Sequence, residues 1–201
     1  MSLEIQSNSN PTEIFADWFQ KAEGSGVFDP TEMALATGTK DGEISVRVVL
    51  LKKFDDKGFC FFTNYNSNKS KALEDNPNGA VAFHWQAPFH RQVRVQGLVE
   101  KMTYEENNKY FQSRPRGSQV AAVASPQSQK ISSREELEKL IKDVEDKYGD
   151  ETIPCPEFWG GWRIRPLRIE FWQSQEFRRH DRFVFTRKSL EDSWSMERVA
   201  P

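Results

Sequence analysis

The residues of this chain that could do chemistry are mostly cations, and they gather in a few short segments. In residues 47–52 (RVVLLK) an apolar run has Arg47 and Lys52 at its two ends. A cation that is buried must be paired or must hold an anion. Residues five apart on an ideal strand face opposite sides, so Arg47 and Lys52 should serve different partners unless a bulge intervenes. For this segment alone, two surface cations at strand ends remain the favoured interpretation.

A second segment, residues 63–71, reads as the end of a strand, a polar loop and the start of a helix. Ser67 can cap that helix, and a helix N-terminus offers free N–H groups and the positive end of a dipole. Phosphate binds well at such a position, and Lys69 adds a charge. The pattern is weak by itself, because capped helices with lysines are common.

A third segment, residues 110–118, places Tyr110, Arg114, Arg116 and Ser118 within one helix end and its turn. A guanidinium presents a fork of donors that matches phosphate geometry, and hydroxyl groups can complete the shell. A solvated basic turn is an equally good interpretation of this segment in isolation.

A fourth segment, residues 172–182, carries alternating chemistry. If it is extended, Trp172, Arg178, His180 and Arg182 point to one face and form a cationic, aromatic wall suited to an anionic planar ligand. Of the three histidines only His180 has such neighbours. The other two are expected to have structural or surface roles.

Several kinds of catalytic site are missing from the sequence. We find no Ser-His-Asp arrangement, zinc-ligand spacing, Walker loop or dinucleotide glycine fingerprint. Cys60 and Cys155 are expected to be reduced structural thiols. Sites able to hold phosphate, without an obvious protein nucleophile, favour an enzyme whose cofactor does the difficult chemistry.

The bulk composition limits how anions could be bound. The chain has 201 residues, of which 37% are hydrophobic and 29% charged, and its formal net charge is -2. This balance gives no general attraction to nucleic acid or to anionic membranes, so anion binding must come from local clusters of cations. No signal peptide and no apolar run of about 20 residues is present, so we expect a soluble, cytoplasmic protein. Because the sequence has no metal-ligand spacing, we also expect no bound metal.

Hydrophobic periodicity predicts the elements that must position these residues. Asn10 and Pro11 begin a helix whose apolar positions run from Ile14 to Ala22, and Gly24 ends it. Turn signals then separate short runs rich in Val, Phe, Leu and Thr, which predicts an antiparallel sheet that closes into a barrel. The strand-like runs are residues 33–37, 44–54, 59–63, 80–85 and 92–102.

Helical patterns return in residues 104–113 and after Ser133, which forms a capping box with Glu136 ahead of an apolar stripe that ends at Gly149. Strand-like runs follow at residues 162–173 and 182–187. We see no repeat and no linker. The prediction is a single α+β, mainly β domain over residues 1–201, with residues 1–10 disordered and residues 150–201 completing the active site.

Five motifs, in this order, resemble the pyridoxine (pyridoxamine) 5′-phosphate oxidase family. They are residues 91–97 (RQVRVQG), 110–118 (YFQSRPRGS), 158–161 (FWGG), 170–173 (EFWQ) and 180–182 (HDR). The similarity runs from about Asp29 to the last residues. Any one motif would be weak, but several in the correct order are specific.

The resemblance implies an FMN-binding split β-barrel with flanking helices, assembled as a homodimer with FMN in the groove between subunits. It implies oxidation at C4′ of pyridoxine or pyridoxamine 5′-phosphate, with hydride passing to flavin N5. Molecular oxygen would then reoxidise the flavin, giving pyridoxal 5′-phosphate and hydrogen peroxide.

The resemblance also implies roles for individual residues. Those matched to FMN contacts are Arg47, Val48, Val49, Leu50, Phe62, Thr63, Asn68, Lys69, Gln92, Gln127, Ser128, Trp172 and Arg182. Those matched to the substrate are Lys52, Tyr110, Arg114, Ser118, Arg178 and His180, of which Arg178 and His180 would lie over the pyridine ring as the catalytic pair.

The chain departs from the family's usual pattern at a few positions. Asn68 stands where an Arg usually neighbours the phosphate-clamping lysine, so we expect weaker FMN binding, by about 1–3 kcal/mol if the lost contact is charge-assisted. Ala121 occupies a usual Gly position and Arg179 a usual Leu position. The N-terminus lacks the longer basic arm that often covers the site.

Two other functions stay open. One is a related flavin oxidase of another aromatic substrate, as in phenazine biosynthesis, although Lys52, Tyr110, Arg114 and Ser118 would then have no phosphate to hold. The other is a non-catalytic binder of FMN or pyridoxal phosphate, against which Arg178 and His180 argue. The sequence does not fix the preference between the two phosphorylated vitamers.

Overall fold

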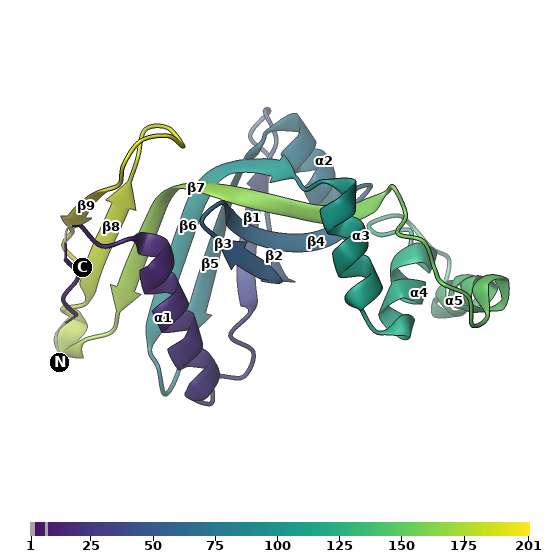
Figure 1. Cartoon of the computed structure of the whole chain (residues 1–201), viewed down its shortest axis with the longest axis horizontal. Coiled ribbons are helices and arrows are strands. Elements are labelled where there is room, and N and C mark those ends of the chain that lie inside the picture. Colours follow the sequence, from purple (N-terminus) through teal and green to yellow (C-terminus); the bar gives the residue numbers. More distant parts are fainter. Residues whose placement is uncertain (1–2, 7) are drawn as a thin grey trace.

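The computed structural model describes residues 3–6 and 8–201 (Figure 1). Its helices in these residues are α1 (Pro11–Gly24), α2 (Asn68–Asp75), α3 (Tyr104–Ser113), α4 (Arg116–Ala124), α5 (Arg134–Tyr148) and the short 3₁₀ turn η1 (Glu176–Arg178). Its strands are β1 (Glu32–Gly38), β2 (Ile44–Leu50), β3 (Lys53–Asp55), β4 (Gly58–Asn64), β5 (Asn78–Trp85), β6 (Arg91–Lys101), β7 (Trp159–Gln173), β8 (Asp181–Thr186) and β9 (Ser195–Arg198).

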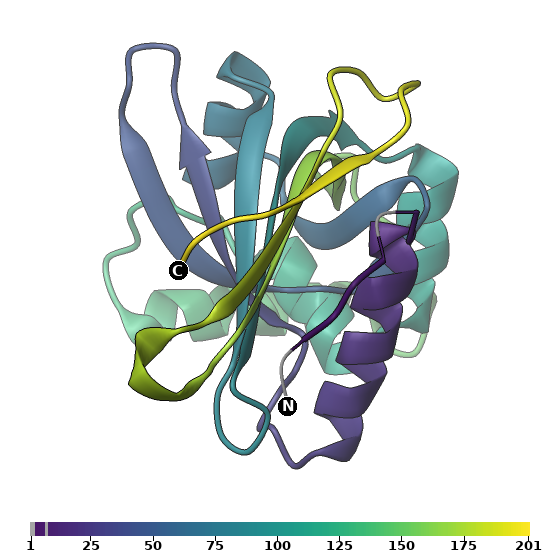
Figure 2. The same ribbon diagram turned by 90° about the vertical axis from the view of Figure 1, so that its left-hand side faces the viewer.

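The strands of the described residues form one curled, antiparallel sheet in the order β2-β1-β5-β6-β7-β4-β3, to which β8 is added beside β7 and β9 beside β8. The long strand β7 joins the two ends of the molecule: residues 159–164 pair with β4, and residues 168–173 pair with β8. Figure 2 shows β8 and β9 crossing the end of the molecule that lies opposite α3, α4 and α5. The predicted α+β, mainly β class with flanking helices is confirmed.

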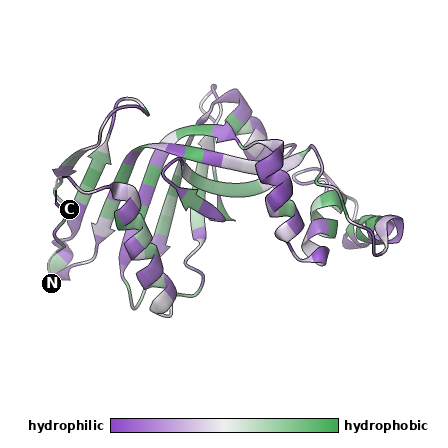
Figure 3. Cartoon of the chain, viewed as in Figure 1, coloured by the Kyte–Doolittle hydropathy of each residue, from purple (hydrophilic) through white to green (hydrophobic). Residues whose placement is uncertain are grey.

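The main hydrophobic core lies between α1 and the sheet. The Asn10 side chain accepts a hydrogen bond from the Thr12 N–H (2.9 Å) and so caps α1 as the sequence predicts. The helix then buries Phe15 and Trp18. Phe15 meets Phe59 of β4 edge to face, at 4.8 Å between ring centroids. Figure 3 shows hydrophobic and hydrophilic residues mixed along both the strands and the helices.

A second, smaller core lies under α3, α4 and α5, and it supports one wall of the cleft described below. Its buried members include Phe111, Val120 and Trp159. Cys155 is also buried there, and burial raises the pKa of its thiol to about 11. Cys60 is buried in the main core and is likewise a free thiol. The prediction of two reduced structural cysteines is confirmed.

The strand predicted over residues 44–54 is wrong as a single element. The chain leaves the edge strand β2 at Leu51, whose N–H donates to the Thr31 carbonyl (2.9 Å), while the Lys52 N–H donates to the Cys60 carbonyl (2.9 Å). One apolar run therefore serves two separate parts of the sheet. Because Arg47 and Lys52 do not lie on one continuous strand, their five-residue spacing no longer determines which sides of the sheet they face.

The extended conformation considered for residues 172–182 is also wrong. After β7 the chain turns through η1, in which Phe177 (φ 56°) and Arg178 (φ 61°) adopt left-handed backbone conformations. Antiparallel pairing of β7 with β8 sets Trp172 opposite Arg182. These two residues therefore share a face by cross-strand pairing and not by alternation along one strand.

The prediction of disorder for residues 1–10 falls partly on residues 1, 2 and 7, which lie outside the described residues. In the described part, the Leu3 N–H donates to the Asp181 carboxylate (2.9 Å), and the Arg198 guanidinium donates to the Leu3 carbonyl (2.9 Å). The start of the chain thus contacts β8 and β9.

Candidate active site

A cleft of about 490 Å³ lies where β2 and β4 face α3 and α4. Its volume is within the range of sites for small ligands. Its lining residues are Val48, Val49, Leu50, Lys52, Phe62, Thr63, Asn64, Lys69, Tyr110, Arg114, Ala121, Ala122, Ser125, Gln127 and Trp159.

Lys69 forms the polar end of the cleft on the side of α2. Its ammonium donates to the hydroxyl of Thr63 (3.0 Å), the hydroxyl of Ser67 (3.3 Å) and the side-chain oxygen of Gln127 (3.2 Å). All three acceptors are neutral. Burial lowers the pKa of Lys69, and the like charge of Arg47 lowers it further. Two neighbouring cations without a carboxylate partner favour an anion between them.

Ser67 precedes α2 as predicted, but its side chain makes no capping hydrogen bond. Its hydroxyl is directed instead to Ser70 and receives the Lys69 ammonium. The first N–H groups of α2 therefore remain available beside Lys69. A helix N-terminus with a lysine next to it is a suitable place for a phosphate group.

A stack of aromatic rings joins the β4 wall of the cleft to α3. The Phe62 and Tyr110 rings stack at 4.0 Å between centroids, and Phe62 stacks on Trp159 at 5.4 Å. The Arg114 guanidinium lies over the Trp159 ring, 4.7 Å from its centroid. Its Nη1 is buried and has no hydrogen-bond partner. Since an unpaired buried donor is costly, Arg114 is suited to receive an anionic ligand at this position.

The electrostatics of the cleft are one-sided. Lys52, Lys69 and Arg114 line it, whereas no Asp or Glu does so within the described part of the chain. Burial raises the pKa of Tyr110, with Arg114 opposing the shift, so the phenol remains a neutral hydrogen-bond donor. Such a donor set fits phosphate groups, and the flat aromatic wall fits a planar ring.

A second group of predicted residues lies on β6, β7 and β8. Trp172 pairs with Gln92 on one side and with Arg182 on the other. The His180 ring lies 4.6 Å from the Trp172 ring, and its Nδ1 accepts the Gln175 N–H (3.1 Å). Because Nδ1 is an acceptor, neutral His180 carries its proton on Nε2 and can donate it to a ligand.

Arg182 in this second group is held by Glu170. Its Nε (3.0 Å) and Nη2 (2.9 Å) both donate to Oε1 of Glu170, and its Nη1 donates to the Ala200 carbonyl (2.8 Å). The side chain of Glu170 is only 2% exposed. Arg182 therefore has a fixed orientation next to Trp172.

The two groups lie at opposite ends of β7 and do not meet within one chain (Figure 1). Trp159 belongs to the cleft and Trp172 to the second group, and the two lie thirteen positions apart along the strand. At about 3.3 Å per residue this is roughly 40 Å along the strand. A small ligand in the cleft cannot also contact Trp172 of the same chain.

The predicted site residues are therefore distributed over two places. The cleft brings together Val48, Val49, Leu50, Lys52, Phe62, Thr63, Lys69, Tyr110, Arg114 and Gln127. Next to it lie Arg47, the exposed Asn68 at the start of α2, Ser118 on α4, and Ser128 beside Gln127. Gln92, Trp172, Arg178, His180 and Arg182 belong to the second group or to the turn leading into it.

The cleft residues from α4 and its C-cap, above all Ala122 and Ser125, were not predicted from the sequence. No helix was predicted there, although residues 116–124 (RGSQVAAVA) form α4 directly after Pro115. The alanines in this segment and a proline just before it were usable signals. Asn64 was missed because a polar residue at a strand end reads as a turn residue.

Two further findings concern metal ligands and membrane spans in the described residues. Within the described residues no group of three or more His, Cys, Asp or Glu side chains could hold a metal ion. Among the helices of the same residues, none has the length and apolar character needed to cross a bilayer.

Comparisons with known proteins point to one family. The family model described as "Pyridoxamine 5′-phosphate oxidase" matches residues 26–148, and that of the "Pyridoxine 5′-phosphate oxidase C-terminal dimerisation region" matches residues 159–201. The pyridoxine/pyridoxamine 5′-phosphate oxidase of Salinibacter ruber is 47% identical over 96% of this chain and 89% of its own length. That of Brucella anthropi is 46% identical over 100% of this chain and 98% of its own.

Solved structures agree on the fold. PhzG from Burkholderia lata, crystallised with tetrahydrophenazine-1-carboxylic acid, superimposes with a TM-score of 0.91 at 26% identity, and the match covers 100% of both chains. A pyridoxamine 5′-phosphate oxidase-related, FMN-binding protein from Nostoc punctiforme superimposes with a TM-score of 0.73 at 13% identity, covering 98% of this chain and 100% of its own. The fold is therefore the split barrel of these proteins.

Proposed function

This chain belongs to the pyridoxamine 5′-phosphate oxidase family, and on that premise we propose that it oxidises pyridoxamine or pyridoxine 5′-phosphate to pyridoxal 5′-phosphate with FMN and O₂, releasing H₂O₂. The observation that carries the proposal is the cleft. It has three cations and an aromatic wall, it has no carboxylate among its described lining residues, and it holds one buried guanidinium nitrogen without a partner.

The cofactor side of the proposed site is the wall formed by β2, β4 and α2. Lys69, the neighbouring Arg47 and the first turn of α2 would hold the FMN phosphate, with Asn68 adjacent to it. Backbone and side chains of Val48, Val49, Leu50, Phe62 and Thr63 would flank the remainder. Gln127, which accepts from Thr63 and Lys69, would lie beside them, with Ser128 next to it in the chain. When bound, FMN would supply hydride acceptance at N5 and subsequent reaction with oxygen.

The substrate side is the wall formed by α3 and α4. Arg114 and Lys52 would neutralise the substrate phosphate, and the Tyr110 and Ser118 hydroxyls would complete its hydrogen bonds. This leaves Arg178 and His180 to act at the pyridine ring. His180 donates from Nε2 in its neutral form, so its role is to orient the ring and exclude water over the carbon that loses hydride.

We further propose that the enzyme is a homodimer in which each cleft is completed by the second group of the partner. The family model of residues 159–201 describes this segment as a dimerisation region. In the single chain, the edge strand β2 exposes alternate apolar residues, Ile44 (76%), Val46 (64%) and Val48 (63%). An exposed apolar edge next to the cleft requires cover, and a second copy would provide it.

A flavin oxidase of a phenazine precursor is the second candidate, favoured by the close superposition with PhzG. That protein's ligand carries a carboxylate and no phosphate. The Arg114 guanidinium has no hydrogen-bond partner at Nη1 and lines the cleft with Lys52 and Tyr110, which favours the larger charge of a phosphate. The relatives at 46–47% identity also carry the oxidase name.

The test is the absorption spectrum of the purified, FMN-loaded protein. We expect pyridoxamine 5′-phosphate to bleach the flavin under anaerobic conditions and air to restore the colour, with one H₂O₂ formed per turnover. A loaded protein that does not bleach contradicts the oxidase function. Bleaching by tetrahydrophenazine carboxylate but not by pyridoxamine 5′-phosphate supports the second candidate.

The same assay tests the roles of the two catalytic candidates. We expect Arg178→Ala and His180→Ala to lower turnover while FMN remains bound, because neither residue is assigned to the cofactor. If both variants lose flavin instead, the two residues belong to the cofactor side.

A further inference from the structure

The side chain of Asn107, in the first turn of α3, is almost completely buried and uses all of its hydrogen-bonding groups in polar contacts. Its exposed fraction is 4%. Its Oδ1 accepts the Gly161 N–H (2.8 Å), and its Nδ2 donates to the Tyr65 hydroxyl (3.1 Å) and to the Met102 carbonyl (3.4 Å). The Tyr65 hydroxyl in turn donates to the Gly161 carbonyl (3.2 Å). The four residues form a closed ring of contacts.

The glycines of the FWGG motif make room for this ring of contacts. A Cβ on Gly160 would lie 2.2 Å from the Tyr65 hydroxyl oxygen and 2.3 Å from Nδ2 of Asn107. A Cβ on Gly161 would lie 2.4 Å from the Met102 sulfur. Two glycines at the start of β7 are therefore needed for the amide to reach the strand.

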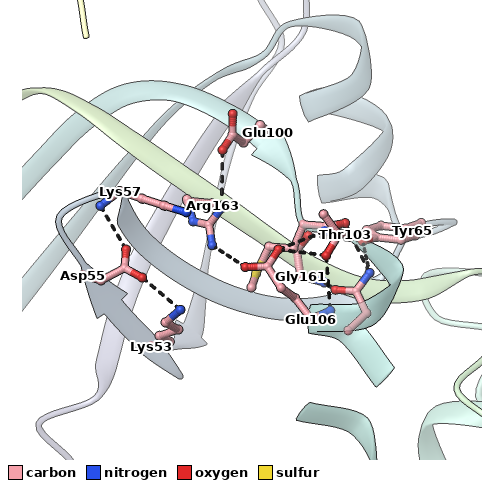
Figure 4. A network of polar contacts seen from close by, with 11 residues as sticks. Lys53, Asp55, Lys57, Tyr65, Glu100, Thr103, Glu106, Gly161 and Arg163 are labelled. Atoms are coloured by element: carbon pink, nitrogen blue, oxygen red, sulfur yellow. Dashed lines mark hydrogen bonds and ion pairs between the residues drawn. The ribbon is translucent and has the colours of Figure 1, made fainter. Parts of the chain in front are cut away.

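A charged contact fixes the same helix turn to the sheet. Thr103 and Glu106 form a capping box at the start of α3, and Glu106 also accepts from Arg163 of β7 (2.7 Å). The Arg163 side chain is 8% exposed and pairs additionally with Glu100 of β6 (3.5 Å). Figure 4 shows Arg163 between Glu100 and Glu106, with Thr103, Gly161 and Tyr65 next to Glu106.

The residues fixed in this way connect the two walls of the cleft. Tyr65 directly follows β4, which contributes Phe62 and Thr63, and the same loop leads to Lys69. Tyr110 and Arg114 lie three and seven residues after Asn107, on the same side of α3 and its end. An amide that contacts Tyr65 from α3 therefore sets how far the phosphate-binding side chains stand from the opposite wall.

We propose that Asn107 is a positioning residue for phosphate binding. Through its contacts with Gly161 and Tyr65 it holds Tyr110 and Arg114 at the correct distance from β4. This inference rests on the proposed function for its substrate, but the geometry on which it depends is independent of the flavin. A small displacement of a helix that carries charge-assisted contacts is sufficient to weaken them.

The experiment compares Asn107→Ala with two controls in the full-length, FMN-loaded enzyme. Asn108→Ala changes the same residue type one position along α3, where its side chain contacts Gln112 on the helix surface. Val120→Ala removes buried volume from the smaller core without touching the ring of contacts. The measurements are KM and kcat for pyridoxamine 5′-phosphate, the Kd of inorganic phosphate by calorimetry, and the Tm.

We expect Asn107→Ala to raise both KM and the phosphate Kd by about tenfold, as expected when a charge-assisted contact is weakened, with a smaller change in kcat. Asn108→Ala should match the wild type, and Val120→Ala should lose Tm while keeping KM. A KM of Asn107→Ala within about twofold of wild type overturns the proposal. An equal rise of KM in Val120→Ala also overturns it, because lost stability alone would then explain the effect.

Tyr65→Phe is the milder variant if Asn107→Ala does not fold. It removes the hydroxyl that the Asn107 amide contacts and keeps the aromatic ring of residue 65, so KM and the phosphate Kd should rise about two- to fivefold. An unchanged phosphate Kd overturns the proposal. If the wild-type protein binds phosphate but does not oxidise the vitamer, the proposed function fails, while the phosphate Kd values still decide the role of Asn107.

Discussion

Glu170 lies in an environment very different from that of a free glutamate, because its side chain is buried among arginines. Burial alone would raise its pKa, but hydrogen bonds from Arg94, Arg168 and Arg182 outweigh burial and lower the pKa below 4.5. The Arg168 guanidinium lies 2.8 Å from Oε2, and Arg94 contacts the same oxygen. Three guanidiniums on one carboxylate leave an excess of positive charge beside Arg182.

This environment predicts how stability depends on pH. Because the pKa of Glu170 is depressed in the folded state, its contribution is fully present above the unfolded value of about 4.5 and is lost as pH falls through the folded pKa. We expect Glu170→Gln to lower the free energy of unfolding at pH 7 by about 1–3 kcal/mol, since the arginines are partly exposed. Urea denaturation at pH 7 and at pH 3 measures both effects.

The matched control is Glu138→Gln, which breaks the exposed pair with Arg134 on α5. Exposed pairs contribute less than about 1 kcal/mol. The difference between the two variants should be smaller at pH 3 than at pH 7, because below about 4.5 the unfolded state takes up a proton that the arginines disfavour on Glu170 in the folded state. An equal loss of stability in both variants at pH 7 contradicts the special role of Glu170.

Asn68 gives a prediction for the cofactor. It is exposed at the start of α2, next to Lys69, so an arginine can be accommodated there. We expect Asn68→Arg to lower the Kd of FMN about five- to a hundredfold, which corresponds to about 1–3 kcal/mol from a charge-assisted phosphate contact. Fluorescence titration of the apoprotein with FMN measures this change.

Asn66→Arg adds the same charge two residues earlier, in the exposed loop before α2. It should tighten FMN binding less, through long-range attraction alone. No tightening in Asn68→Arg, or equal tightening in both variants, contradicts a specific contact at position 68.

At the residue scale, the sequence indicated which side chains belong to the site better than it indicated which residues contact one another. Lys52, Lys69, Tyr110 and Arg114 do share one cleft, as the resemblance implied. No local pattern could pair Lys69 with Gln127, because that contact joins residues 58 positions apart. For the same reason Glu170 received no role from the sequence, since its partners lie on three different strands.

At the scale of elements, periodicity located most of the helices and strands but not where the strands break. Residues 44–54 have continuous β character, yet the chain changes neighbours at Leu51 because β3 pairs with β4 and β2 pairs with β1. The turn at Phe177 and Arg178 was invisible to a pattern argument, since left-handed backbone at such residues is rare. Both features depend on tertiary pairing.

Gly97 gives a prediction at this scale. The register of β6 against β7 shifts between Gln96 and Gly97, and a Cβ on Gly97 would lie 1.9 Å from the Arg165 carbonyl oxygen. The atoms that an added Cβ would meet belong to the backbone of β7, which cannot move aside as the end of a flexible side chain can. We expect Gly97→Ala to lower the free energy of unfolding by about 2–4 kcal/mol, measured by urea denaturation.

The control is Gly117→Ala in α4, where nothing lies within 4 Å of the added Cβ. Alanine is the better helix former, so this variant should gain up to about 1 kcal/mol. If both substitutions change the free energy of unfolding in the same direction, the close approach of β6 to β7 is not what requires a glycine at position 97.

At the scale of the whole molecule, the length of β7 separates the two groups of site residues. β7 carries Trp159 at one end and Trp172 at the other, so no conformation of a single intact sheet brings them to one small ligand. The sequence motifs could place both groups in one site only through the family's dimer. A two-fold symmetric dimer would create two equivalent clefts, each with side chains from both subunits.

This arrangement predicts that two inactive variants can restore activity to each other. Arg114→Ala damages the cleft, and His180→Ala damages the second group. In a mixed dimer one site would carry both substitutions and the other would carry neither. With statistical mixing we expect about a quarter of the wild-type activity, because half of the dimers are mixed and half of their sites are intact. Refolding the two variants together and assaying H₂O₂ release measures this recovery. If each site belonged to one chain, every site in a mixed dimer would have a defect, and the mixture would stay as inactive as the separate variants.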